Sequence, residues 1–316
     1  MTSVSVASSQ PVPPDADSVA SFLSGRYPRV SSLVLLQSGG WSSAYAFESD
    51  EADLVVRFGR YAEDFEKERV AATWAVQGLP IPEVLELGDA FDGSFIVSRR
   101  HYGQKLADLT ADRVPAVMEN LVSILAKVST IELPGSGCGI WLAPECHAPG
   151  SNWVTSLLMD RDRGESRLVD WRAKLAAVPG AMSAFERGFD ALPSLLTGVR
   201  DVRKVVHGDI LLNHLIADDD SITAVFDWGN SVAGDPLYDI AWMVFCIPWF
   251  PSVNREHVLA LSRTYLPSRW NEDALFAYEL HIAVSAMQYM AFAGAVGELV
   301  STMDQVNSML AAAGSK

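Results

Sequence analysis

The chain has few cysteines, a shortage of basic residues and no apolar run long enough to cross a membrane. Three cysteines among 316 residues cannot form a disulfide framework, which favours a reducing, cytoplasmic setting. The formal net charge of −15, from 39 acidic and 24 basic residues, argues against nucleic-acid binding, which needs clustered lysine and arginine. The longest uncharged stretch, Ile282 to Gly297, is shorter than the roughly 20 residues of a membrane span and predicts a buried helix. The composition therefore predicts no nucleic-acid partner and no membrane partner, and no obligatory protein partner is evident from the sequence.

The pattern of apolar residues changes once along the chain. Residues 1–16 are rich in serine, proline and alanine and predict a flexible tail. Short β-like runs and one helix follow, and we expect strands at 33–36, 44–47, 54–58, 83–88 and 94–98, with the helix at 62–76. After Gly103, an apolar stripe from Val114 to Val128 has helical spacing.

These patterns predict two lobes of α+β class. The first, residues 17–100, is a small antiparallel sheet with one helix. The second, residues 101–316, is larger and mainly helical, with one exception around residues 203–227.

The informative segment runs from Val205 to Ala241. Strands on either side of an acidic turn predict a hairpin centred near Asp220, which would place Asp227 opposite residue 213 or 214. Asp227, either Asn213 or His214, and the upstream Asp209 would then meet at the open end of the hairpin. Two carboxylates beside a polar side chain suit a divalent cation and a base that activates a hydroxyl group. Taken singly, each of these acids could equally belong to a solvated turn or a helix cap.

Two segments carry a family resemblance, HGDILLNH and VFDWGNSVAGDPLYDIA. They resemble the catalytic and metal-binding motifs of the aminoglycoside phosphotransferase family, relatives of protein kinases. The resemblance covers nearly the whole chain, and LPIPEVLELG, SRR and ITAVFDWGN are similar to the branch that phosphorylates hygromycin. It implies a two-lobe, protein-kinase-like fold that uses ATP and Mg²⁺ to phosphorylate a hydroxyl group of a small molecule. A cationic aminoglycoside-type antibiotic, inactivated by this reaction, is the leading acceptor.

The resemblance implies roles for the acids of both motifs. Asp209 matches the catalytic aspartate, which orients the acceptor hydroxyl group and takes its proton. Asp227 matches the aspartate that binds magnesium at the ATP phosphates. His207 matches a structural histidine, and Asp235 and Asp239 match positions that support the loop and the following helix.

One position departs from the family pattern. The family usually has asparagine five residues after the catalytic aspartate, whereas this chain has His214 there and Asn213 one residue earlier. Magnesium prefers oxygen ligands, so imidazole is a poor direct substitute. Either His214 contacts the metal or a phosphate, directly or through water, or Asn213 serves the metal, and loss of catalysis is a third reading. Trp228 could line the acceptor site or pack in the core.

The resemblance also assigns the phosphate-binding part of the nucleotide site. Ser38, Gly39 and Gly40 match the loop over the ATP phosphates, although the same residues could form a simple hairpin turn. Arg57 stands where most kinases have a phosphate-binding lysine, and Glu68 is the candidate for its ion-pair partner.

The remaining nucleotide contacts fall between the lobes. Ser98, Arg99 and Arg100 match the lobe connection, where backbone groups would bind adenine.

The sequence leaves the acceptor and the activity open to alternatives. A macrolide, a nucleoside-like antibiotic or a metabolite alcohol could replace the aminoglycoside. The stretch 152–162 could supply acids for a cationic acceptor, or it could be a surface helix. A nucleotide-binding pseudokinase and a structural protein without nucleotide are the readings from other classes.

Overall fold

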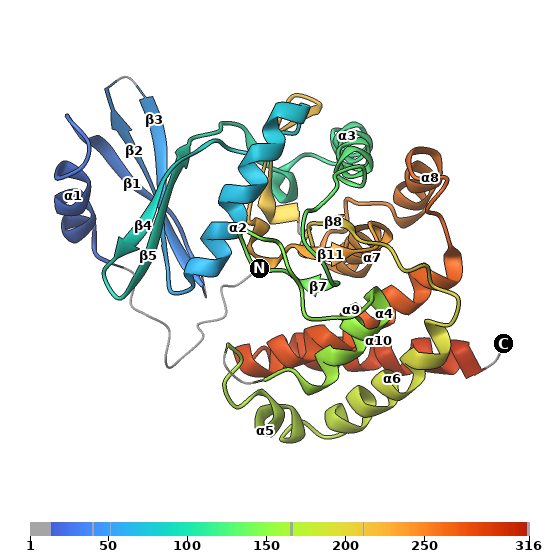
Figure 1. Ribbon diagram of the computed structural model, residues 1–316. Coiled ribbons are helices and arrows are strands. Elements are labelled where there is room, and N and C mark those ends of the chain that lie inside the picture. The colour runs from blue at the N-terminus through green and yellow to red at the C-terminus, as the bar shows by residue number, and fades with distance from the viewer. Residues whose placement is uncertain (1–13, 40, 51, 165–166, 211, 315–316) are drawn as a thin grey trace.

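The computed structural model describes residues 14–39, 41–50, 52–164, 167–210 and 212–314, and combines an antiparallel sheet with a mainly helical part (Figure 1). The helices are α1 Ala16–Ser24, α2 Ala62–Ala72, α3 Val114–Val128, α4 Trp153–Met159, α5 Trp171–Ala176, α6 Ala181–Leu195, α7 Leu237–Cys246, α8 Arg255–Tyr265, α9 Glu272–Ala293 and α10 Val296–Gly314. The strands are β1 Ser31–Ser38, β2 Ser42–Ser49, β3 Ala52–Gly59, β4 Val84–Ala90, β5 Gly93–Arg99, β6 Gln104–Lys105, β7 Gly139–Ile140, β8 Lys204–Val206, β9 Leu215–Asp218, β10 Ser221–Val225 and β11 Val232–Gly234. The predicted α+β class is confirmed.

The first sheet has the strand order β1-β2-β3-β5-β4, with antiparallel neighbours. Each strand expected from the sequence overlaps one of these five. Helix α1 packs against the sheet through the buried Val19 and Leu23, in a cluster with Phe47, Val56 and Phe95 of the strands. The helix begins at Ala16, the last residue of the expected tail, because the Asp15 side chain accepts a hydrogen bond from the Ser18 backbone N–H at 2.8 Å.

Helix α2 lies between the sheet and the helical part (Figure 1). The expected helix over 62–76 is α2 followed by a 3-10 turn at Thr73–Gln77, and Gly78 ends it in a left-handed conformation. Ala71 and Trp74 belong to the large hydrophobic core that includes α3, α7 and α9, whereas the sheet and α1 have a cluster of their own. Helix α2 also contacts β4 and β5, so it packs against both the sheet and the helical part.

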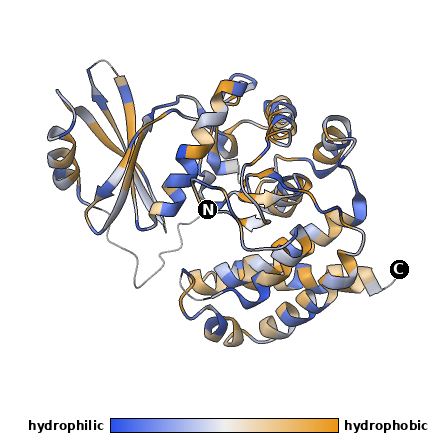
Figure 2. Ribbon diagram, viewed as in Figure 1, coloured by the Kyte–Doolittle hydropathy of each residue, from blue (hydrophilic) through white to orange (hydrophobic). Residues whose placement is uncertain are grey.

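The helical part surrounds that large core. The stripe at 114–128 forms α3 with the bounds the sequence indicates, and its apolar positions are buried. In Figure 2 hydrophobic and hydrophilic residues mix along most helices, as expected where one face of a helix is buried. Within the described ranges, no helix combines the length and apolarity needed to cross a bilayer.

Two expectations about this part are wrong. The predicted helix from Ile282 to Gly297 is interrupted, because α9 ends at Ala293, Gly294 has φ +70° and α10 begins at Val296. The region after residue 101 also has strand outside 203–227, namely β6, β7 and β11. These strands have only two or three residues each, too few to show a period of two.

Two small sheets bring the two motifs together. The β9–β10 hairpin turns at Asp219 and Asp220 and pairs Val225 with Leu215, as predicted. Extending this register by two residues places Asp227 opposite Asn213. Strand β11, which follows the second motif, pairs with β8, which leads into the first, so the segments before Asp209 and after Asp227 are neighbours.

Candidate active site

The turn that carries Asp209 depends on a glycine. Gly208 has φ +76°, and a Cβ atom there would lie 2.5 Å from the backbone oxygen of Asn230. Only glycine fits both this conformation and this close contact. The turn at residues 207–209 therefore packs directly against the backbone that follows Asp227.

Asp209 is half-buried, and its carboxylate has a fixed hydrogen-bond donor. Asn230 Nδ2 donates to Asp209 Oδ2 at 2.9 Å. Burial raises the pKa of Asp209 above its usual value and the nearby Asp227 adds to this, whereas His214 and the Asn230 hydrogen bond act in the opposite direction. An oriented carboxylate with a raised pKa is suited to accept a proton from a hydroxyl group.

His214 joins the two acids. Its Nδ1 lies 3.0 Å from the backbone oxygen of Asp209, and its Nε2 lies 3.4 Å from Asp227 Oδ2. A carbonyl oxygen only accepts hydrogen bonds, so Nδ1 carries a proton and donates it. Nε2 is the ring nitrogen that faces the Asp227 carboxylate. The predicted meeting of Asp209, His214 and Asp227 is therefore present.

Asp227 has an unusual conformation and a polarised environment. Its φ is +68°, and its side chain is 42% exposed. Burial alone would raise the pKa of Asp227, but Arg57, His214 and His207 outweigh it and leave the pKa below its usual value. Asp227 is thus ionised at neutral pH and available to a cation.

The metal ligands predicted around Asp227 are only partly assembled by protein atoms. Asn213 is half-buried, one residue before His214 in a 3-10 turn. Among the described residues, no group of three or more histidine, cysteine, aspartate or glutamate side chains is placed to hold a metal ion. The carboxylate of Asp227 suits a divalent ion whose other ligands come from outside the protein, and His214 Nε2 lies 3.4 Å from it.

Arg57 and Glu68 form the predicted ion pair. Arg57 Nη2 on β3 donates to Glu68 Oε1 on α2, and the side chains are only 15% and 11% exposed. Burial raises the pKa of Glu68 to about 7 although Arg57 opposes this shift. Glu68 is therefore part of a buried ion pair and is not a solvent-exposed helix charge. The charge of Arg57 also acts on Asp227, so this pair belongs to the same electrostatic environment.

The predicted phosphate loop connects β1 with β2. The backbone N–H of Gly39 donates to Ser42 O at 2.9 Å, and the hydroxyl groups of Ser38 and Ser43 are 3.1 Å apart. Gly40 lies outside the described residues. Trp41, next along the chain, stacks on Phe292 of α9 with 5.8 Å between ring centroids, so the end of this hairpin reaches the helical part.

The predicted adenine segment lies at the end of β5. Ser98 pairs with Val55 and Val84 in the sheet. The backbone N–H of Arg99 donates to Glu83 O at 3.0 Å and that of Arg100 donates to Asp53 O at 2.9 Å. Both amides are already used, so an adenine base could meet only carbonyl oxygens at these two residues.

The expected supporting residues are buried in polar contacts. Asp239 accepts hydrogen bonds from the backbone N–H groups of His207 and Gly208, both at 2.9 Å. Asp235 accepts from the Leu237 backbone N–H at 3.1 Å, at the start of α7. Burial lowers the pKa of His207 to about 4, so its ring binds a proton too weakly at neutral pH to act as an effective general base.

Trp228, for which the sequence left two readings, is a core residue. It is buried and donates from Nε1 to Val225 O at 3.0 Å. Its ring packs against Trp74 with 5.5 Å between centroids. It therefore does not line an acceptor site.

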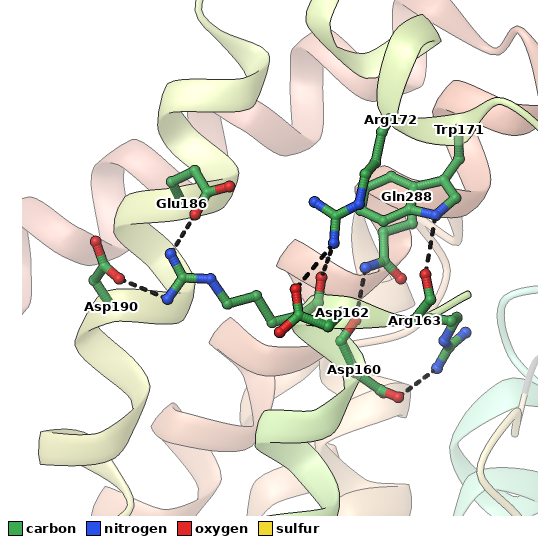
Figure 3. Close-up of polar contacts among 9 residues, drawn as sticks. Asp160, Asp162, Arg163, Trp171, Arg172, Glu186, Asp190 and Gln288 are labelled. Carbon is green, nitrogen blue, oxygen red and sulfur yellow. Dashed lines mark hydrogen bonds and ion pairs between the residues drawn. The ribbon is translucent and has the colours of Figure 1, made fainter. Parts of the chain in front are cut away.

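The acidic stretch at 152–162 is engaged in ion pairs. It forms α4 and a 3-10 turn, and Figure 3 shows Asp160 and Asp162 in contact with Arg163 and Arg172. Arg161 also bonds outward to Glu186 and Asp190. Both carboxylates therefore have arginine partners, while the Asp162 side chain remains 85% exposed, and a role of this stretch in binding a cationic acceptor stays a prediction.

Two residues at the site were missed by the sequence analysis. Asn230 orients Asp209, and Lys67 donates from Nζ to Gly229 O and Ser231 O at 3.0 and 2.7 Å. The signal for Asn230 was its place three residues after Asp227. Lys67 gave no signal, because it stands in a charged helical segment that is typical of a solvated surface.

Comparison with known proteins identifies the family. Residues 34–272, which include both motifs and every candidate site residue, match the phosphotransferase enzyme family. The chain belongs to this family. As a member of the phosphotransferase enzyme family it is a small-molecule kinase, and the predicted resemblance is confirmed.

Relatives of this phosphotransferase include an antibiotic kinase. Hygromycin-B 4-O-kinase of Escherichia coli is 29% identical over 244 residues, which cover 76% of this chain and 70% of that protein. A thermostable mutant of the aminoglycoside phosphotransferase APH(4)-Ia, in a ternary complex with AMP-PNP and hygromycin B, has a TM-score of 0.83 at 25% identity and covers 95% of this chain and 100% of that one. Another mutant, with ADP and hygromycin B, has a TM-score of 0.81 at 26% identity, covering 92% and 97%. The predicted kinase-like fold is confirmed.

Proposed function

We propose that this phosphotransferase moves the γ-phosphoryl group of ATP to a hydroxyl group of hygromycin B or a similar aminoglycoside, which inactivates the antibiotic and confers resistance. The convergence of Asp209 and Asp227 on His214 carries the proposal. The solved relatives that bind AMP-PNP or ADP together with hygromycin B support ATP as the donor and an aminoglycoside as the acceptor. The three free cysteines are consistent with action in the cytoplasm.

In this proposal the acceptor hydroxyl group is activated by Asp209. Its carboxylate, oriented by the Asn230 side chain at 2.9 Å, accepts the hydroxyl proton as the new bond to phosphorus forms and the bond to the ADP oxygen breaks. The raised pKa of Asp209, caused mainly by burial, makes it a better proton acceptor than a solvated aspartate. His207 Nε2 contacts Phe226 O at 3.1 Å, so this residue supports the turn and takes no part in proton transfer.

The other side of the site binds the phosphates. Asp227 and His214 would hold Mg²⁺, with Asn213 as the alternative amide ligand, and bound Mg²⁺ supplies charge neutralisation at the phosphate oxygens. Arg57, fixed by Glu68, supplies positive charge to the same region. Ser38, Gly39 and Gly40 would cover the phosphates, and the carbonyl oxygens at Ser98, Arg99 and Arg100 would face adenine.

The acceptor assay tests this proposal. Purified protein is mixed with Mg²⁺-ATP and hygromycin B, other aminoglycosides, a macrolide or a nucleoside antibiotic, and ADP release is followed. We expect release that depends on hygromycin B and falls by at least about 10³-fold in Asp209→Asn. Asp220→Asn, an exposed acid in the hairpin turn of the same segment, is the matched control and should keep wild-type turnover.

Other results would assign the protein differently. Turnover with a macrolide or a nucleoside antibiotic but no aminoglycoside would correct the acceptor and keep the phosphotransferase chemistry. A thermal shift with AMP-PNP, no turnover with any acceptor and no effect of Asp209→Asn would indicate a nucleotide-binding regulator. The absence of any shift with nucleotide would refute the proposed donor site.

A further inference from the structure

Lys67 is a buried lysine in the middle of α2. It is 2% exposed, and its Nζ donates to Gly229 O at 3.0 Å and Ser231 O at 2.7 Å. The Trp141 ring centroid lies 5.1 Å away. Over the ranges that the structure describes, no carboxylate lies within ion-pair distance of Nζ, so carbonyl oxygens and an aromatic ring replace the lost water. Burying a charged amine without a carboxylate partner costs free energy, so packing alone does not account for a lysine at this position.

The two carbonyl groups that Lys67 binds stand on either side of Asn230. The Asn230 side chain donates to Asp209 Oδ2, and its backbone oxygen abuts Gly208, where a Cβ atom would lie 2.5 Å away. Because Lys67 fixes the carbonyl groups of the residues before and after Asn230, it limits how the backbone around Asn230 can move. Its two hydrogen bonds therefore act on the orientation of the Asp209 carboxylate.

A second group of contacts holds α2 against the same turn. A Cβ atom at Gly229 would lie 2.8 Å from the Cβ of Asp64, so the helix and the turn are as close as glycine permits. Arg167, from the segment before α5, donates to both carboxylate oxygens of Asp64 at 3.0 Å and to Glu63 at 2.6 Å. The start of α2 is thus tied to the helical part by charge-assisted hydrogen bonds.

The residue after Lys67 connects α2 to the sheet instead of the helical part. Glu68 pairs with Arg57 on β3, in the sheet. Neighbouring residues on a helix point about 100° apart, so Lys67 and Glu68 contact two different elements. Through these two side chains, α2 sets the sheet and the turn at 228–231 at one relative position.

We propose that Lys67 is a positioning residue that couples the Arg57–Glu68 pair to the Asn230–Asp209 pair through the turn at 228–231. The proposal rests on phosphoryl transfer as the function of the site. Lys67 touches neither Asp209 nor any candidate nucleotide contact, so it acts on the rate of the chemical step through the geometry of Asp209. Its loss should change kcat far more than the KM for ATP.

The first test is Lys67→Met, which removes the amine and keeps an unbranched side chain. We expect kcat to fall by about 10- to 100-fold and the KM for ATP to stay within about 2-fold. The control is Arg200→Met, which also removes a basic side chain that donates to a main-chain carbonyl, Ser268 O at 3.1 Å, and should leave kcat within about 2-fold. Wild-type kcat in Lys67→Met would overturn the proposal. If Lys67→Met does not fold, Lys67→Gln keeps an amide donor. In that variant kcat should fall less than in Lys67→Met, and the KM for ATP should again stay unchanged.

A double-mutant cycle separates positioning from general destabilisation. If Lys67 acts through Asn230, the variant with both Lys67→Met and Asn230→Ala should be about as slow as Asn230→Ala alone, because the interaction is already lost. Effects that multiply would show that Lys67 acts elsewhere and would refute the coupling.

Amide hydrogen exchange provides a readout that does not need activity. In Lys67→Met we expect faster exchange in peptides covering 228–232 and unchanged exchange in α10. Unchanged exchange at 228–232 would overturn the proposal even in an active enzyme. If the wild-type protein phosphorylates no acceptor, the proposed function fails, and the exchange result still decides whether Lys67 holds the turn.

Discussion

The two sides of the candidate site are built in different ways. On the helical side, the turns that carry Asp209 and Asp227 are fixed by buried polar side chains, with Asp239 binding the backbone of one turn and Lys67 that of the other. On the sheet side, the turn at Ser38 and Gly39 depends on a backbone hydrogen bond and one contact between serines, at the end of the edge strand β1.

This difference follows from what each side does in the proposed reaction. Proton abstraction needs a carboxylate positioned within a fraction of an ångström, which supporting hydrogen bonds to the backbone of its turns provide. Phosphate binding through backbone amides tolerates a more open loop, because the ligand itself completes the contacts. Changes on the helical side should therefore reduce the rate steeply, and changes at the exposed margin of the sheet should matter little.

The largest effect is expected for Asp227→Ala. It removes the carboxylate that would bind the metal at the phosphates, so phosphoryl transfer should fall by at least about 10³-fold, and Mg²⁺-dependent binding of AMP-PNP should weaken as well. Isothermal titration with and without Mg²⁺ measures the second effect. Asp209→Asn serves as the comparison, since it should lose turnover and keep nucleotide affinity. Equal affinities in the two variants would contradict this division of roles.

Arg57→Met should produce the next largest effect, at the boundary between the two sides. Leaving Glu68 buried without its partner should lower the free energy of unfolding by about 3 kcal/mol. In the variant with both Arg57→Met and Glu68→Leu, most of that stability should return, because no unpaired charge remains, while nucleotide affinity stays low. Urea unfolding and AMP-PNP titration on both variants check this. A double variant with restored affinity would show that Arg57 has no contact with the nucleotide.

Part of this arrangement was predictable from sequence, because it depends on residues that are close together along the chain. The turn residues around Asp220 predict the hairpin, and a register shift between Ile222 and Ala224 then places Asp227 opposite residue 213. The apolar stripe fixes α3 for the same reason.

Contacts between distant segments were not predictable. From the sequence, Lys67 and Asp64 are typical of charged residues on a solvated helix face, but in the structure Gly229 packs against them. In the same way, the sequence does not indicate that Asp160 and Asp162 have arginine partners. Such pairings depend on tertiary packing, which a single sequence does not encode in any short pattern.

A smaller effect, on pH dependence, should come from Lys67. Burial lowers its pKa from 10.5 to about 7, with Arg167 acting in the same direction and Asp64 and Glu63 opposing. Below that pKa the buried amine is charged and its burial penalty is fully present. As the pH rises toward 10.5, the unfolded chain binds more protons than the native one, so stability increases.

The comparison of Lys67→Met with wild type isolates this contribution. Between about pH 7 and pH 9, the free energy of unfolding of wild type should gain about 2 kcal/mol relative to the variant, since one pKa unit corresponds to about 1.4 kcal/mol. Urea unfolding at the two pH values measures the change. A difference that is constant with pH would show that native Lys67 keeps its proton up to pH 9, so that burial does not lower its pKa into this range.

The smallest effect is expected for Arg99→Ala, at the margin of the sheet. The ion pair of Arg99 with Glu83 is 2.8 Å long, but the side chains are 53% and 62% exposed, and such surface pairs contribute about 0–1 kcal/mol. The backbone N–H of Arg99 keeps its bond to Glu83 O in the variant, so the end of β5 should be unchanged. We expect AMP-PNP affinity within about 2-fold of wild type, because an adenine contact here would involve main-chain oxygen atoms that every residue has. A loss of affinity larger than about 10-fold, measured by titration at two salt concentrations, would show that the guanidinium itself binds the nucleotide. The exposed margin of the sheet would then be as sensitive to substitution as the helical side.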